Sequence, residues 1–115
     1  MTEKEDFIFV EHILDSINAI SSFSKNLSKE QLISNRLKQS AIVREIEIIG
    51  EAVKNISETL KNKHPEVLWK EIAGTRDKMI HHYFGVDISI VWNIISSDLP
   101  ILKEQMLNIK EELKK

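Results

Sequence analysis

The sequence predicts an all-α protein, folded as an up-and-down bundle of about four to five helices. Apolar residues recur at helical spacing through most of its 115 residues. No alternating apolar and polar run bounded by turn residues is found, and three glycines with two prolines offer few of the breaks that a sheet requires. Because this length is typical of one domain, we expect residues 1–115 to form a single unit.

The first helix is expected over residues 3–24, where apolar residues share one face and Thr2 begins a capping box. Ser28 begins a second capping box, and Asn35 offers another helix start a few residues later. A short separate turn is therefore expected before the next helix, which we predict to run to about Lys61.

This second helix carries a very regular apolar stripe, whose members alternate steps of four and three. Such a stripe packs nearly parallel to a partner helix, either in the core of a bundle or along a dimer seam. Gly50 interrupts the helix at a cost of about 1 kcal/mol relative to alanine, which a close backbone approach would justify. The stripe residues are Ile42, Ile46, Ile49, Val53, Ile56 and Leu60.

A break follows at His64-Pro65, because proline disfavours a helical conformation in the residue before it. The third helix is expected to begin there and to continue to Gly85, where glycine can supply a left-handed stop. Gly74 is expected to loosen the middle of this helix, and Trp69 to lie in the core.

The last helical stretch is expected to be capped by Asp87 and interrupted by Pro100. Its apolar rhythm nevertheless continues across the proline on one face, from Ile95 to Leu113. We therefore expect either a kinked rod or two collinear helices, the second of which starts at Asp98.

Composition narrows the class of function. No cysteine occurs, which excludes disulfides, thiolate zinc sites and a cysteine nucleophile and favours a cytoplasmic location. No run approaches the ~20 apolar residues of a membrane span, and the acidic first residues do not resemble a secretory signal. The formal net charge of −2 argues against a general nucleic-acid coat, so any RNA contact must be local.

Chemistry-bearing residues gather between Arg76 and Tyr83, with Asp77, His81 and His82 among them. The planar guanidinium of Arg76 can bind a phosphate with two parallel bonds, and His81 titrates near neutral pH, as a general acid or base must. These groups suit metal-free RNA cleavage, because the ribose 2′-hydroxyl is an internal nucleophile once a base removes its proton. DNA lacks that hydroxyl and would not be a substrate. Adjacent histidines diverge by about 100° on a helix, so we expect no metal site.

The spacing Arg76-x4-His81-x-Tyr83 resembles the signature of HepT-like toxins, a branch of the HEPN superfamily. Further fragments also resemble this family and occur in the same order, so the resemblance covers about residues 40–107. These fragments are Ile48-Ile-Gly-Glu-Ala52, Trp69-x-x-Ile72 followed by Gly74-x-Arg76, and Val91-Trp92 with Asp98-Leu-Pro100.

The resemblance implies a HEPN-like ribonuclease toxin that forms a homodimer, with Arg76 and His81 as its catalytic pair. It also implies a partner, an MNT-type nucleotidyltransferase antitoxin that transfers AMP from ATP to Tyr83 and so blocks the site. ATP and magnesium would then serve the antitoxin's reaction, whereas RNA cleavage itself would need no cofactor.

Two residues depart from the family pattern. Asp77 stands where many members have Asn, and its carboxylate could pair with Arg76 or repel RNA phosphate. His82 offers a competing spacing for the base, but His81 is favoured because it places Tyr83 correctly.

Helical geometry sets a further constraint on the catalytic pair. On an ideal helix the step from Arg76 to His81 turns about 140°, so the two side chains diverge. Either the helix distorts before Gly85, or two chains pool their pairs across a two-fold axis, and we predict the second. Glu51 is a candidate for orienting either side chain.

Two other functions remain open. One is a non-catalytic module that binds nucleotide or assists a separate nucleotidyltransferase, which Asp77 makes possible. The other is a dimeric interaction domain whose motif has lost activity. ATP binding without RNA cleavage would favour the first, and the absence of both activities would favour the second.

Overall fold

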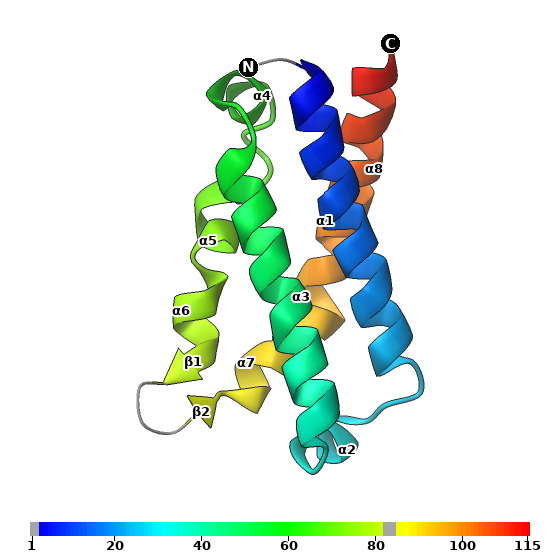
Figure 1. Ribbon diagram of the computed structural model, residues 1–115, viewed down its shortest axis with the longest axis vertical. Coiled ribbons are helices and arrows are strands. Elements are labelled where there is room, and N and C mark those ends of the chain that lie inside the picture. Colours follow the sequence, from blue (N-terminus) through cyan, green and yellow to red (C-terminus); the bar gives the residue numbers. More distant parts are fainter. Residues whose placement is uncertain (1–2, 82–84) are drawn as a thin grey trace.

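The computed structural model describes residues 3–81 and 85–115, except for the side chains of Ile80 and His81. Helices arranged in four antiparallel rods make up the bundle (Figure 1). The first rod is α1 (Glu3–Ser24), and the second is α3 (Arg36–Asn55), preceded by α2 (Lys29–Ile33) and followed by α4 (Glu58–Lys63). The third contains α5 (Trp69–Ala73) and α6 (Thr75–Met79), and the fourth contains α7 (Ile88–Asn93), the π-helical turn η1 (Ile94–Asp98) and α8 (Leu99–Lys114).

This arrangement confirms the predicted all-α, up-and-down bundle. The bounds of α1 agree with the expected helix over residues 3–24, although the cap expected at Thr2 lies outside the described residues. The capping box at Ser28 is present, with its hydroxyl accepting from the Gln31 backbone N–H at 3.1 Å. Asn35 caps α3 in the same way, so local sequence sets both helix starts.

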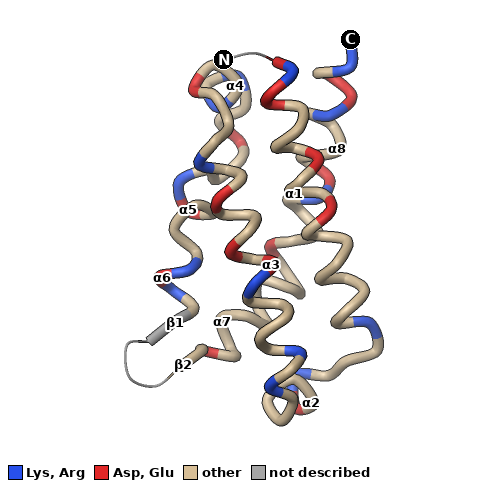
Figure 2. The backbone as a smooth tube through the Cα atoms, viewed as in Figure 1, with Lys and Arg blue, Asp and Glu red and all other residues tan. Residues whose placement is uncertain are grey.

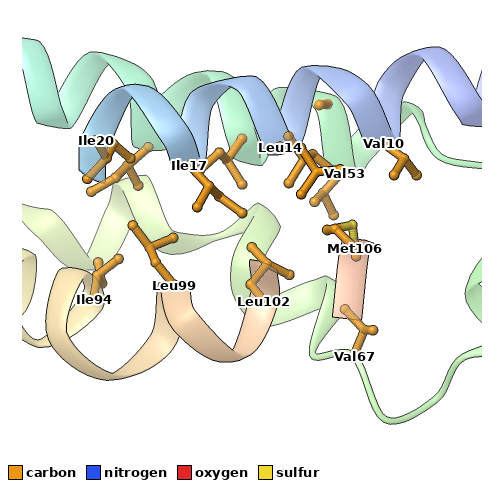
Figure 3. Packing of buried hydrophobic residues seen from close by; sticks show 14 of the residues in the cluster. Val10, Leu14, Ile17, Ile20, Val53, Val67, Ile94, Leu99, Leu102 and Met106 are labelled. Atoms are coloured by element: carbon orange, nitrogen blue, oxygen red, sulfur yellow. The ribbon is translucent and has the colours of Figure 1, made fainter. Parts of the chain in front are cut away.

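The predicted apolar stripe, which runs along α3 and ends at Leu60 in α4, lies in the core of the bundle, where each of its six residues is at most 4% exposed. Figure 3 shows Val53 of this stripe near Leu14 of α1 and Met106 of α8. Burial of each such side chain contributes roughly 1.5–3 kcal/mol to folding. Because these contacts are made within one chain, the stripe is bundle core and not a dimer seam.

The second helix ends earlier than predicted, at Asn55 instead of Lys61. Ile56 adopts an extended conformation, and Ser57 then caps the separate helix α4. Two sets of contacts hold the chain at this break. The Ser57 hydroxyl accepts from the Leu60 N–H at 3.2 Å, and, far away in sequence, Asp6 Oδ1 accepts from the Ser57 backbone N–H at 2.9 Å and Asp6 Oδ2 from its hydroxyl at 2.6 Å. Asp6 is only 3% exposed, so this carboxylate fixes the chain at the end of α3.

The close backbone approach expected at Gly50 is present. A β-carbon placed on Gly50 would lie 3.4 Å from the carbonyl oxygen of Ala73 and 3.5 Å from that of Ile72. These are van der Waals contact distances, so α3 lies close against the carboxyl end of α5, immediately before Gly74 and α6.

The single long helix predicted from Pro65 to Gly85 is wrong. Gly74 is the C-cap of α5, where the backbone leaves the helical conformation with ψ of 6°, and α6 ends after Met79. The Met79 carbonyl instead accepts from the Asp87 N–H at 2.7 Å, a bond to a returning segment of chain that a continuing helix would not make.

A small antiparallel ladder occupies this return, where no strand was predicted. It pairs β1 (Ile80–His81) with β2 (Gly85–Val86), in the register Ile80 with Val86 and His81 with Gly85. Gly85 has the left-handed conformation expected of it, with φ of +77°, but it begins a strand and does not stop a helix.

The fourth rod is continuous through Pro100, which agrees with the first of the two expected alternatives, a single rod. Asp87 caps α7 by accepting from the Ile90 N–H, and the rod then widens into the π-helical turn η1. In this turn the Leu99 N–H donates to the Ile94 carbonyl five residues earlier, and Pro100, which has no N–H to donate, follows in the first turn of α8. Asp98 provides no side-chain cap, so α8 continues the rod and does not start afresh.

Candidate functional site

Arg76 lies on α6, next to the face of α3, and its side chain is 65% exposed. Its Nε donates to Oε2 of Glu47 at 2.6 Å, and Glu47 is itself 26% exposed. A guanidinium carries five N–H donors, so this bond fixes one edge and leaves other donors for a ligand. The arrangement presents an oriented cation to solvent, as the recognition of a phosphate requires.

A cavity of about 650 Å³ opens beside this pair, between α1, α3 and the α5–α6 segment. Its volume lies in the range of about 300–1,000 Å³ that small-molecule sites occupy. Along α3 the basic residues of the first half are followed by acidic ones in the second half, and α6 brings further cations beside it (Figure 2). The polar residues that line the cavity are His12, Arg44, Glu47, Glu51, Lys54, Asn55 and Arg76.

A second cavity, of about 610 Å³, lies between the third and fourth rods and has a mainly apolar lining. Lys78 of α6 reaches this cavity, whereas Arg76 reaches the first. The side chains of α6 thus divide between two surfaces, and the candidate catalytic arginine belongs to the polar one.

Glu47, which sequence reasoning missed, is the carboxylate that contacts Arg76. The candidate Glu51 lies one turn further along α3, where it is 3.8 Å from Lys54 Nζ. Both glutamates face the same cavity because residues four apart share a helix face. The four-residue spacing could have identified both glutamates as candidates for contact with Arg76. The choice between them depends on where α6 lies along the length of α3.

Asp77 does not take the position beside Arg76 that its carboxylate could have occupied. Its side chain is exposed, and within residues 3–81 and 85–115 it makes no ion pair. Its backbone N–H donates to the Gly74 carbonyl at the start of α6. The pairing of Arg76 with Glu47 therefore replaces the pairing considered for Asp77.

The remaining candidates lie partly or wholly outside the described residues. His81 has its backbone in β1, but its side chain is not described, and His82 and Tyr83 are outside the described ranges. The helix that carries Arg76 ends at Met79, before any of them. The ideal-helix angle of about 140° therefore does not apply to Arg76 and His81, and this argument for two pooled chains loses its premise.

His64 has a structural place, away from both Arg76 and the polar cavity. Its Nδ1 lies 3.1 Å from Glu66 Oε2 and its Nε2 lies 3.0 Å from Glu112 Oε2, while its carbonyl accepts from the indole of Trp69 at 3.0 Å. The Glu66 backbone N–H, followed by the His64 imidazole, holds the pKa of the Glu66 carboxyl below its ordinary value. These contacts tie the loop before α5 to α8, and Trp69 is buried as expected.

Two further searches cover the described part of the chain. It contains no group of three or more His, Asp or Glu side chains arranged to hold a metal ion. It also contains no helix that is long and apolar enough to cross a membrane.

Comparison with known proteins places this geometry in context. The family model described as "Ribonuclease HepT-like" matches residues 13–109. A "Probable ribonuclease HepT" from Thermococcus cleftensis is 40% identical over 103 residues, which are 90% of this chain and 94% of that protein. A "Putative RNase" from Caldanaerobacter subterraneus is 44% identical over 106 residues, which are 92% of this chain and 95% of that protein.

A longer relative also matches. A "Gamma-glutamylcyclotransferase and putative RNase" from Methanocaldococcus jannaschii is 41% identical over 112 residues, which are 97% of this chain but 50% of that protein. The chain thus spans half of this relative. No solved structure matches the chain.

Proposed function

This chain belongs to the HepT-like ribonuclease family, and we propose that it is a toxin endoribonuclease that cleaves RNA with Arg76 and His81, without a metal ion. One observation carries the proposal: Glu47 holds the exposed guanidinium of Arg76 at the edge of a polar cavity. A phosphodiester could reach this guanidinium without any rearrangement of the bundle. The names of the relatives support RNA as the substrate.

In the proposed reaction, His81 removes the proton from a ribose 2′-hydroxyl, and the 2′-oxygen attacks the adjacent phosphorus. Arg76 stabilises the negative charge that develops on the non-bridging oxygens of the pentavalent phosphorane. The bond between phosphorus and the 5′-oxygen then breaks, this oxygen takes up a proton from water, and His81 releases its proton to solvent. The products are a 2′,3′-cyclic phosphate and a 5′-hydroxyl.

The substrate chemistry gives the first test. We expect the purified protein to cleave a single-stranded RNA in excess EDTA, with products that end in a cyclic phosphate and a 5′-hydroxyl. An oligonucleotide with 2′-deoxyribose at every position should remain intact, because the internal nucleophile is missing. Cleavage that stops in EDTA, or that extends to the DNA oligonucleotide, would contradict the proposed mechanism.

A second prediction concerns the positioning of Arg76. Glu47→Gln removes the charge that orients the guanidinium, and we expect kcat on RNA to fall by about ten- to a hundredfold, since small misplacements of a catalytic group have effects of this size. KM should change less, because Arg76 remains as a cation. Steady-state kinetics on one RNA substrate would measure both constants.

Glu51→Gln is the matched control for this prediction. It makes the same change on the same helix face one turn away, where the carboxylate lies near Lys54 and not near Arg76. Its kcat should stay within about twofold of the parent value. Equal losses in the two variants would show that the general charge of α3 matters and that a specific pairing does not.

Regulation by a partner is a further part of the proposal. The Arg-x4-His-x-Tyr signature supports an MNT-type antitoxin that transfers AMP from ATP and magnesium to Tyr83, and it supports a homodimer. Native mass spectrometry after co-expression should give the mass of a dimer with one AMP added per modified chain. A monomer that is fully active would exclude the dimer, and an unmodified Tyr83 in an inactive complex would exclude neutralisation by AMP.

The alternative is a non-catalytic module that binds nucleotide. The size and mixed charge of the polar cavity favour this second candidate. ATP binding by a protein that leaves every RNA substrate intact would support it over the ribonuclease.

A further inference from the structure

The polar cavity contains groups that the proposed reaction does not use. Phe9 and His12 line it from α1, on the side opposite α6, and Arg44 lines it from α3. His12 and Arg44 are both exposed. Since α1 and α6 both pack against α3, the cavity joins these groups to Arg76 across one helix.

Phe9 and His12 form an aromatic pair on adjacent turns of α1. Their ring centroids lie 5.9 Å apart, and the ring planes meet at 89°, which is an edge-to-face arrangement. Such a pair fixes the orientation of the exposed imidazole and offers an aromatic surface at the cavity wall. Aromatic surfaces of this kind bind the flat faces of nucleic-acid bases.

Arg44 supplies the unbalanced charge of the cavity. The lining contains three cations (Arg44, Lys54 and Arg76) and two carboxylates, which gives one net positive charge when His12 is neutral. The carboxylate of Glu47 is paired with Arg76, and that of Glu51 lies near Lys54. In the part of the chain that the structure describes, Arg44 makes no ion pair, so its guanidinium is available to a phosphate.

We propose that this cavity is a nucleotide subsite, in which the Phe9–His12 pair receives a base and Arg44 binds the phosphate of a nucleotide that neighbours the scissile one. The inference rests on the proposed ribonuclease function, because RNA is the substrate that would bring a second nucleotide alongside Arg76. In this proposal, residues of α1 and α3 also bind the substrate, although they lie outside the Arg-x4-His-x-Tyr signature. The ligand has a base and a phosphate, which a stretch of RNA and a free mononucleotide both possess.

Arg44→Ala and His12→Ala test the subsite, with Arg36→Ala as the matched control. Arg36 is also an exposed arginine on α3, but it does not line the cavity. We expect KM for a short single-stranded RNA to rise about fivefold or more in the first two variants, with kcat within about twofold, because stacked bases and phosphate contacts contribute to binding by such factors. Arg36→Ala should leave both constants unchanged.

The salt dependence of binding separates the two contacts. Arg44→Ala should reduce the slope of log K against log salt concentration by about 1, whereas His12→Ala should leave it unchanged. Unchanged KM in Arg44→Ala, or an equal rise in Arg36→Ala, would overturn the subsite. Both side chains are exposed, so Arg44→Ala should leave the melting temperature unchanged, and His12→Ala should lower it by only about 5 °C or less, through loss of the contact with Phe9.

Binding to a 2′-O-methyl RNA distinguishes failure of the subsite from failure of the nuclease. If the parent protein cuts no RNA but binds this oligonucleotide, and Arg44→Ala weakens the binding at least fivefold, the subsite stands and the ribonuclease proposal falls. The last measurement is the binding of AMP to the parent protein and to Arg44→Ala. AMP binding that needs Arg44, together with RNA binding that does not, would assign the cavity to a free nucleotide and overturn the RNA subsite.

Discussion

Arg76→Ala is expected to reduce RNA cleavage by at least about a hundredfold, since removal of one donor that stabilises transition-state charge has effects of about 10²–10³ in kcat. The fold should be unaffected, because the side chain is 65% exposed and contributes nothing to the apolar core. Single-turnover cleavage of one RNA, with circular dichroism of the same sample, measures both quantities. Expression of the Arg76→Ala variant without the proposed antitoxin should also no longer arrest growth.

Two control variants make this result specific. Arg76→Lys keeps the charge but loses the planar fork, so its activity should lie between those of the parent and Arg76→Ala. Lys78→Ala removes a cation from the same short helix, but from the side that faces the second cavity, and should leave cleavage within about twofold. If Arg76→Ala retains full cleavage and toxicity, Arg76 is not catalytic.

Asp6→Ala is expected to destabilise the protein by about 3 kcal/mol, the largest stability effect that we predict for a single polar side chain. The substitution removes both acceptors of Ser57, whose N–H and hydroxyl donate to the carboxylate at 2.9 and 2.6 Å. Hydrogen bonds to charged groups contribute about 1.5–3 kcal/mol each, and buried donors left without partners add a penalty. Urea unfolding at neutral pH would measure the loss.

The matched control for this substitution is Asp15→Ala, on the exposed side of the same helix, which should change stability by no more than about 0.5 kcal/mol. The double variant with Ser57→Ala should lose less than the sum of the two single variants, because both remove the same contact. An Asp6→Ala protein as stable as the parent would show that this buried carboxylate does not fix the end of α3.

These expectations connect the fold to the site through α3. Its buried stripe faces the bundle core, while Glu47 on its other side contacts Arg76 from a helix 29 residues later in the chain. The two helices meet in this way because α5 lies against the backbone of α3 at Gly50, just before α6 begins. Substitutions that move α5 away from Gly50 should therefore also disturb the pairing of Glu47 with Arg76.

The sequence by itself determined the features that depend on near neighbours. The apolar stripes gave the all-α class and the buried faces, because a helix repeats its side-chain directions every 3.6 residues. Ser28, Asn35 and Asp87 gave helix starts, because a cap needs only the N–H groups two or three residues later. The Arg-x4-His-x-Tyr spacing gave the family, which the match over residues 13–109 confirms.

The tertiary structure decided where helices stop and which charges meet. Asp6 holds Ser57, just after the end of α3, from 51 residues away in the sequence, and the Asp87 N–H donates to the Met79 carbonyl where α6 was expected to continue. The choice of Glu47 over Glu51 as the partner of Arg76 likewise depends on how far α6 sits along α3. Local periodicity carries no information about such contacts, because they form, and stabilise the fold, only after segments that are distant in sequence have packed together.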